Sequence, residues 1–393
     1  MASATEPLTL HLRLDTGDFH RRDLLAAVQL PLDIMQRRLP AAGATDFAVQ
    51  VTTADGATLP AQVDERGLLT WLIAGVLPRG TEQRYTCRLG GAPPDQGGVN
   101  IAVKADRLIF TQPGRLLASY IFQGTWKPYF WPVMTPVGNV VRGASGEHQH
   151  QTGLFLAYGG HGGPTTSNVW SDWDEPPYGP DGKMLHVSWE RVEGGPVYAR
   201  VVERLIYTNG TADYLLDERR EIRLTPMPDG SVLFDIRQQP SAPQEAGPSP
   251  FILAARIADP LRLVDLNHRD AQRQAMPLDQ PGRLSSDEEL HLETPANATY
   301  RTTGRRLDWC GDLGGGVAGL AFFDHPDNPQ EGRGLSAGGY GCMTMRSLYP
   351  AGAASGSVQF QRRAIAHPGD SEAAGIAQQY QNYAHPPRVT VEG

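Results

Sequence analysis

Glycine and proline interrupt this chain so often that few segments are long enough for a helix. The 393 residues include 44 glycines and 32 prolines, and both residues disfavour helix interiors. In the segments between these glycines and prolines, apolar residues alternate with polar ones, for example over residues 8–14 and 85–89. A period of two is typical of strands with one buried face. The chain is therefore predicted to be all-β.

A Gly/Pro-rich segment over residues 90–98 divides the chain into two parts. We predict a small N-terminal β-sandwich over residues 1–92. Residues 99–393 keep the β pattern, and segments such as 217–224 alternate in charge, which suits antiparallel strands with one solvated face. No 40–50-residue repeat supports a propeller. The second part is therefore predicted to be a large antiparallel two-sheet sandwich.

One helix is predicted near the C-terminus. Ile376, Tyr380 and Tyr383 are spaced as on one helix face, and Pro386 would end the helix. Asp370 or Ser371 is expected to cap its first turn.

Composition excludes several classes of function. The net charge is −8 without a Lys/Arg block, so nucleic acid is not an expected partner. No apolar run approaches the roughly 18 residues of a membrane span, and the start of the chain lacks the pattern of a secretion signal. Three distant cysteines argue against a disulfide framework. A soluble cytoplasmic protein is expected.

Three of the eleven histidines lie close together in the sequence, at His148, His150 and His161. If residues 148–150 form a strand, His148 and His150 point to the same face. This spacing suits two ligands of one divalent metal ion, or an acid and a base for one substrate. The alternative is two surface histidines on a solvated sheet face. Aromatic residues, which commonly line sugar sites, are frequent nearby: Trp126, Tyr129, Trp131, Trp170 and Trp173.

A second candidate lies where an apolar strand over residues 317–323 meets Asp324 and His325, followed by two prolines. Side chains at a strand end are often functional because the sheet holds them rigidly. The alternative is a stiff turn in which Asp and Asn cap backbone groups.

Several segments together resemble the PmoA family, whose inherited label is methane oxygenase. Residues 127–138 read Lys-Pro-Tyr-Phe-Trp-Pro-Val-Met-Thr-Pro-Val-Gly, which is similar to the family pattern K-P-Y-F-x-P-x-x-T-P-x-G. Residues 308–310, 323–329 and 340–341 resemble three later motifs, and the likeness covers about residues 1–390. Two family positions, a histidine and an arginine, are Gln151 and Thr152 here.

This resemblance implies a galactose-mutarotase-like supersandwich, in which a histidine acid and a carboxylate or histidine base act on a sugar within an aromatic cleft. Together with the aromatic and histidine clusters, it leads us to predict substrate-binding residues at Lys127, Tyr129, His161, Trp170 and Tyr340. The loss of two motif residues indicates that substrate or activity differs from the family norm.

The predicted function is a carbohydrate-active enzyme of the glycoside hydrolase, lyase or sugar isomerase type, which acts by general acid/base chemistry. His148 and His150 would transfer protons or hold a divalent metal ion, and Asp324 and His325 would complete the site from the opposite sheet. One alternative is a metal-dependent oxygenase, in which a carboxylate from Glu147 or Asp324 joins the two histidines. The other is a non-catalytic carbohydrate-binding protein.

Overall fold

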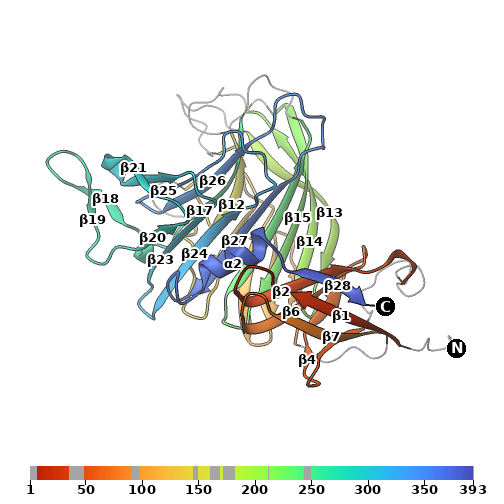
Figure 1. The fold of residues 1–393 in the computed structure, drawn as a ribbon. Coiled ribbons are helices and arrows are strands. Elements are labelled where there is room, and N and C mark those ends of the chain that lie inside the picture. The colour runs from red at the N-terminus through yellow and green to blue at the C-terminus, as the bar shows by residue number, and fades with distance from the viewer. Residues whose placement is uncertain are drawn as a thin grey trace.

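A computed structural model describes residues 7–34, 48–90, 97–144, 149–159, 169–170, 182–210, 212–242 and 249–392. Strands dominate this part of the chain (Figure 1), which confirms the predicted all-β class. Helix α2 (Ile376–Ala384) lies near the C-terminus, as predicted.

Two small sheets are built mainly from the first ninety residues. Their side chains share one hydrophobic cluster that includes Leu12, Trp71 and Cys87. The five-stranded sheet has the order β28 (Arg388–Glu392), β1 (Leu8–Asp15), β7 (Glu82–Leu89), β3 (Val49–Thr53) and β4 (Thr58–Leu59). The three-stranded sheet has the order β2 (Arg21–Gln29), β6 (Leu68–Leu77) and β5 (Ala61–Val63). The last strand of the chain thus belongs to the first sheet.

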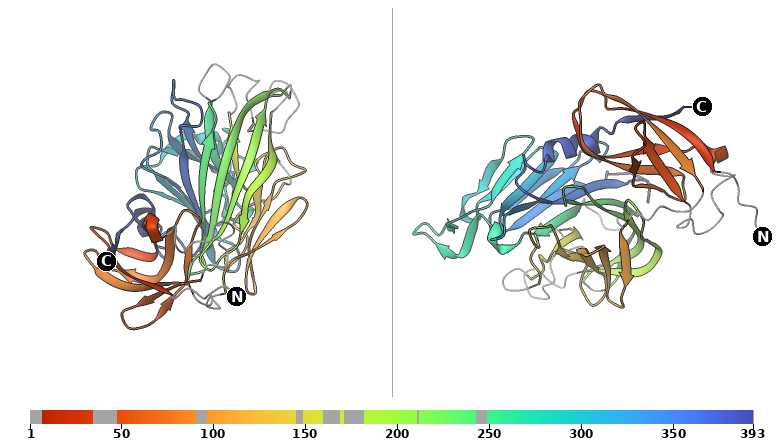
Figure 2. Two further views of the ribbon diagram at one scale, coloured as in Figure 1. Left: turned by 90° about the vertical axis from the view of Figure 1, so that its right-hand side faces the viewer. Right: turned by 90° about the horizontal axis from the view of Figure 1, so that it is seen from below.

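Two larger sheets hold most of the remaining strands that the structure describes, and Figure 2 shows the N-terminal strands gathered on one side of them. The ten-stranded sheet has the order β21 (His291–Thr294), β22 (Thr299–Thr302), β25 (Gly334–Gly338), β26 (Cys342–Leu348), β17 (Pro250–Arg256), β12 (Leu154–Tyr158), β11 (Tyr129–Val133), β10 (Arg115–Ile121), β9 (Arg107–Gln112) and β8 (Asn100–Val103). The eight-stranded sheet has the order β13 (Lys183–Glu193), β14 (Ala199–Thr208), β15 (Tyr214–Pro226), β16 (Val232–Pro240), β27 (Phe360–Pro368), β24 (Val317–Asp324), β23 (Arg306–Asp312) and β20 (Arg283–Ser286). A separate hairpin pairs β18 (Val264–Arg269) with β19 (Ala275–Pro277).

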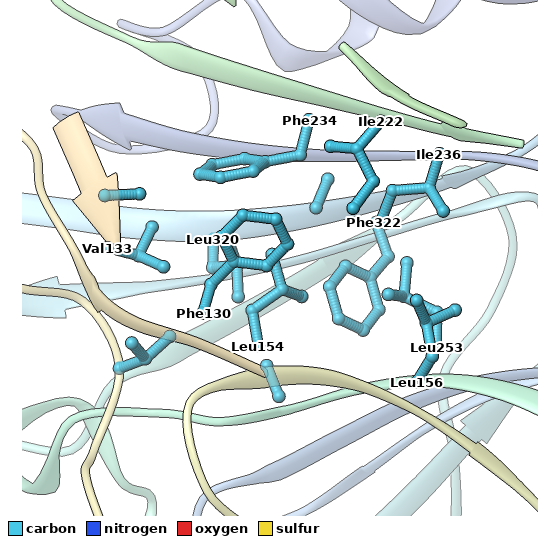
Figure 3. Packing of buried hydrophobic residues seen from close by; sticks show 14 of the residues in the cluster. Phe130, Val133, Leu154, Leu156, Ile222, Phe234, Ile236, Leu253, Leu320 and Phe322 are labelled. Atoms are coloured by element: carbon cyan, nitrogen blue, oxygen red, sulfur yellow. The ribbon is translucent and has the colours of Figure 1, made fainter. Parts of the chain in front are cut away.

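The main core lies between the ten-stranded and eight-stranded sheets (Figure 3). Phe130 of the first sheet meets Phe234 of the second with ring centroids 5.1 Å apart. Along β12, Leu154 and Leu156 join this core, whereas Phe155 belongs to a separate cluster. Since side chains alternate along a strand, Phe155 marks the outer face of the ten-stranded sheet.

Helix α2 packs on the outer face of the eight-stranded sheet. Ile376 and Tyr380 share a cluster with Phe323 of β24, and Leu25 of β2 packs against the same cluster. The helix begins later than the expected cap, after Gly375, whose φ of 62° is left-handed. Asp370 caps the preceding turn instead, where its Oδ1 accepts a hydrogen bond of 3.0 Å from the Ala373 amide.

Residues 217–224 have a half-exposed face that carries Asp217, Arg219 and Arg223, but their charges are not confined to it. Glu218 and Arg220 are fully buried on the inner face of β15. They can be buried there because each charge meets its counter-charge, at 2.7 Å between Arg220 Nε and Glu218 Oε1. The division of the chain at residues 92 and 99 stays a prediction.

Candidate functional site

Lys127 joins two segments that lie far apart in the sequence. It precedes β11 and is almost completely buried. Its Nζ donates hydrogen bonds to the carbonyl oxygens of His150, at 2.9 Å, and Trp170, at 2.8 Å. The same ammonium lies 4.9 Å from the centroid of the Phe155 ring. Lys127 therefore holds His150 and Trp170 against the outer face of the ten-stranded sheet.

A second buried cation, Arg256, lies at the end of β17 on the same face. Its Nη1 donates to Gln151 Oε1 at 3.2 Å, and its Cζ lies 5.0 Å from the centroid of the Tyr340 ring. Gln151 in turn contacts the Tyr340 hydroxyl at 3.5 Å, the outer limit of a hydrogen bond. Sequence analysis missed Arg256, although an arginine that ends the apolar run of residues 251–255 is an unusual signal.

Aromatic side chains surround these polar groups. Phe155, Trp170 and Cys342 form one cluster, against which Tyr129 and Tyr340 pack. We call the whole group the outer-face cluster; its members are Lys127, Tyr129, His150, Gln151, Phe155, Trp170, Arg256, Tyr340 and Cys342. It combines flat rings with hydrogen-bonding groups outside the main core.

Burial controls the ionisation of two members of the outer-face cluster. It raises the pKa of the Tyr340 hydroxyl far above its ordinary value. It also raises the pKa of the Cys342 thiol to about 11, even though the Arg256 charge acts in the opposite direction. Both groups are therefore neutral near pH 7. Tyr340 can donate or accept a hydrogen bond, but it is a poor base at that pH.

The structure brings five of the predicted site residues together: Lys127, Tyr129, His150, Trp170 and Tyr340. His150 is buried and lies in a turn before β12, not in a strand. The argument that strand alternation aligns two histidines therefore does not apply to it. His148 and His161 lie outside the described residues, as do Glu147 and Trp173.

Asp324 and His325 do not join the outer-face cluster. Asp324 is fully buried and accepts hydrogen bonds from Arg305, at 2.9 Å, and Asn328, at 2.7 Å. Its burial raises the pKa of the carboxyl, although these neighbours act against the shift. His325 packs beside α2, with its ring centroid 5.0 Å from that of Tyr383. These contacts are those of a stiff turn, so a catalytic role of the pair stays a prediction without support from this arrangement.

The described residues contain no group of three His, Cys, Asp or Glu side chains that could hold a metal ion. The metal pair of the sequence prediction includes His148, which is outside those residues. The divalent metal ion and the oxygenase alternative therefore stay predictions. No helix within the described ranges is both long and apolar enough to cross a membrane.

Comparison with known proteins places the chain in a family. A family model described as a family of unknown function, DUF6807, matches residues 108–381. The chain belongs to the DUF6807 family. The resemblance to the PmoA family was therefore wrong. The resemblance rested on a few short motifs, whereas the DUF6807 model matches the chain over residues 108–381.

No curated protein matches this member of the DUF6807 family. Among solved structures, an alpha-mannosidase from Enterococcus faecalis V583 matches with a TM-score of 0.44 and 8% sequence identity. The match covers 98% of this chain and 46% of the mannosidase chain, so this chain spans about half of that length. A likeness this distant carries no information about activity.

Proposed function

We propose that this protein is an enzyme that acts on a sugar or glycoside, with its substrate bound at the outer-face cluster. One observation supports this most. Polar and aromatic side chains from separate segments, among them Lys127, His150 and Arg256, meet on the sheet face that points away from the main core. A fold gains little stability from such groups there, because even paired buried polar side chains are often no more stabilising than apolar ones of the same shape.

The chemistry of the cluster suits a sugar. A pyranose has apolar faces that stack on aromatic rings and a rim of hydroxyls that needs donors and acceptors. Tyr129 and Trp170 supply rings, and Gln151 and Tyr340 supply a side-chain amide and a hydroxyl. Two buried cations add positive charge, which favours a substrate that carries or develops negative charge.

His150 is the proposed acid or base. Histidine has an ordinary pKa near neutrality, so it can accept or release a proton at pH 7. Hydrolysis, elimination and epimerisation of sugars all require proton transfer. Lys127 positions His150 through its hydrogen bond to the His150 carbonyl.

The test is a screen of aryl glycosides, uronic acids and free aldoses and ketoses, with products detected by NMR. On any substrate found, His150→Gln should lower turnover by roughly 10²–10⁴-fold with little change in melting temperature. His291→Gln is the matched control, because this histidine is 68% exposed on β21 and should not matter. Equal activity of both variants would exclude His150 from proton transfer.

A second candidate is a carbohydrate-binding protein without turnover. Within the described part of the outer-face cluster, His150 is the one side chain whose ordinary pKa lies near 7. A binding protein does not need a side chain that exchanges protons at that pH. Tryptophan fluorescence that shifts with a sugar, while the sugar itself stays unchanged after long incubation, would favour this candidate. Turnover of any substrate would favour the enzyme.

A further inference from the structure

A cavity of about 250 Å³ lies on the other side of the large sandwich. Its walls come from the outer face of the eight-stranded sheet, from β2 and β6, and from α2. In Figure 1, α2 lies between the strands β24 and β27 and the N-terminal strands. We call this space the helix-side cavity. It shares no residue with the outer-face cluster.

Three arginines on the outer face of the eight-stranded sheet line the helix-side cavity, and two of them are paired. Arg363 binds Asp235 through two hydrogen bonds, of 2.7 and 2.9 Å. Arg223 binds Glu221 at 2.9 Å. Arg237 is half-buried and forms no hydrogen bond or ion pair with any residue that the structure describes. The cavity wall therefore carries an uncompensated guanidinium.

Polar residues make up much of the remaining wall of the helix-side cavity. They include Glu221, Thr225, Asp235 and Gln361. Such groups can donate hydrogen bonds to the hydroxyls of a polar ligand or accept hydrogen bonds from them.

His325 adds a hydrogen-bond donor. Its Nδ1 accepts a hydrogen bond of 3.2 Å from the Asp327 amide, and burial lowers the pKa of the imidazole. The ring is therefore neutral at pH 7 with its proton on Nε2. Apolar contact area comes from Leu25 and Leu68 on the opposite wall.

We propose that the helix-side cavity binds a small hydroxylated carboxylate of monosaccharide size. The guanidinium of Arg237 matches the two oxygens of a carboxylate, and the polar wall around His325 and Gln361 matches hydroxyl groups. The volume of about 250 Å³ is below the roughly 300–1,000 Å³ of pockets for drug-sized ligands, which favours a compact ligand. This site is independent of the proposed catalytic one.

Isothermal titration calorimetry of the full chain with D-gluconate tests the proposal, with D-glucose and acetate as probes that lack the charge or the hydroxyls. We expect gluconate to bind and the other two to bind at least ten-fold more weakly. Glucose 6-phosphate tests whether phosphate replaces carboxylate; tighter binding than gluconate would overturn the carboxylate assignment. No heat with gluconate at 10 mM, on the order of the weakest useful affinities, would overturn the proposal.

Two variants locate the ligand. Arg237→Gln should weaken gluconate binding at least ten-fold, whereas Arg204→Gln, on the exposed part of β14, should leave it unchanged. Gln361→Met should weaken binding several-fold, because it removes a hydrogen-bonding side chain from the cavity wall at similar volume. His150→Gln should leave gluconate binding unchanged. Equal binding by wild type and Arg237→Gln would place the ligand elsewhere.

Discussion

The interior of the large sandwich contains a charged network between its two sheets. Arg220 and Glu218 are both fully buried and lie 2.7 Å apart. Tyr120 of the opposite sheet donates a hydrogen bond of 2.7 Å to Glu203 and accepts one of 3.1 Å from Arg220. The network links the two sheets at one position, so it favours one alignment of the layers over others.

Arg220→Met should lower the free energy of unfolding by roughly 3–5 kcal/mol, because Glu218 would keep a buried charge without its partner. The double variant Glu218→Leu/Arg220→Met should lose less than the single one, since neither charge remains. Urea denaturation measures both. Arg204→Met, at a half-exposed position, is the control. An Arg220 variant as stable as this control would mean that the network does not stabilise the fold.

The buried pair of His367 and Asp308 should make stability depend on pH. Burial alone would lower the pKa of His367, but the Asp308 carboxylate at 2.9 Å outweighs it and raises the pKa. A raised histidine pKa stabilises the fold fully below the unfolded value of about 6.5 and no longer does so once the pH passes the folded value. The melting temperature should therefore fall as pH rises from 6 to 9.

This decline should be weaker in His367→Gln, which has no proton to lose in that range. His268→Gln serves as the control, because His268 is exposed. Thermal melts in matched buffers across the range measure the difference. Parallel curves for wild type and His367→Gln would assign the pH dependence to other groups.

At the scale of the element, α2 connects the two halves of the molecule. Ile376 is fully buried against the eight-stranded sheet, and Gln379 donates a hydrogen bond of 2.9 Å to the Arg22 carbonyl of β2. Ile376→Ala should destabilise the protein by roughly 2–5 kcal/mol, because it leaves a cavity in this contact. Gln378→Ala on the exposed side of the helix should change stability by under about 0.5 kcal/mol. Chemical denaturation compares the two variants.

The alternation of side-chain types along the sequence predicted the strands better than it predicted which face of a strand is exposed to solvent. The strand over residues 217–224 was expected to have one solvated face, and Asp217 and Arg219 are half-exposed on it, yet Glu218 and Arg220 face the core. Alternation places two sets of side chains on two faces, and only the neighbouring sheet decides which face is covered. The same limit applies to Phe155. It lies within the apolar strand β12, where a core position would be expected, but it belongs to the outer-face cluster.

At the scale of the whole molecule, the chain ends in the sheet where it begins. β28 pairs with β1 in antiparallel register, with Leu12 opposite Val391. A fragment of residues 1–92 would expose the edge of β1, and such edges promote aggregation. We expect this fragment to be unstable alone and to gain stability when residues 386–393 are fused to it through a Gly/Ser linker.

Urea denaturation followed by tryptophan fluorescence distinguishes the two fragments, because Trp71 lies in the shared cluster. A fused fragment with Val391→Asp is the control, since it supplies the strand but disrupts its packing. If residues 1–92 alone unfold cooperatively at the same urea concentration as the fused form, the predicted domain is complete without the last strand.

The sequence by itself determined the all-β class and the C-terminal helix. These follow from local causes: glycine and proline exclude helices, and side-chain period sets the type of element. Only the tertiary structure decided that Arg256 and Gln151 join the outer-face cluster, that Asp324 and His325 lie apart from it, and that β28 completes the first sheet. These depend on strand pairing between residues far apart in the chain, and no local pattern records which strands become neighbours.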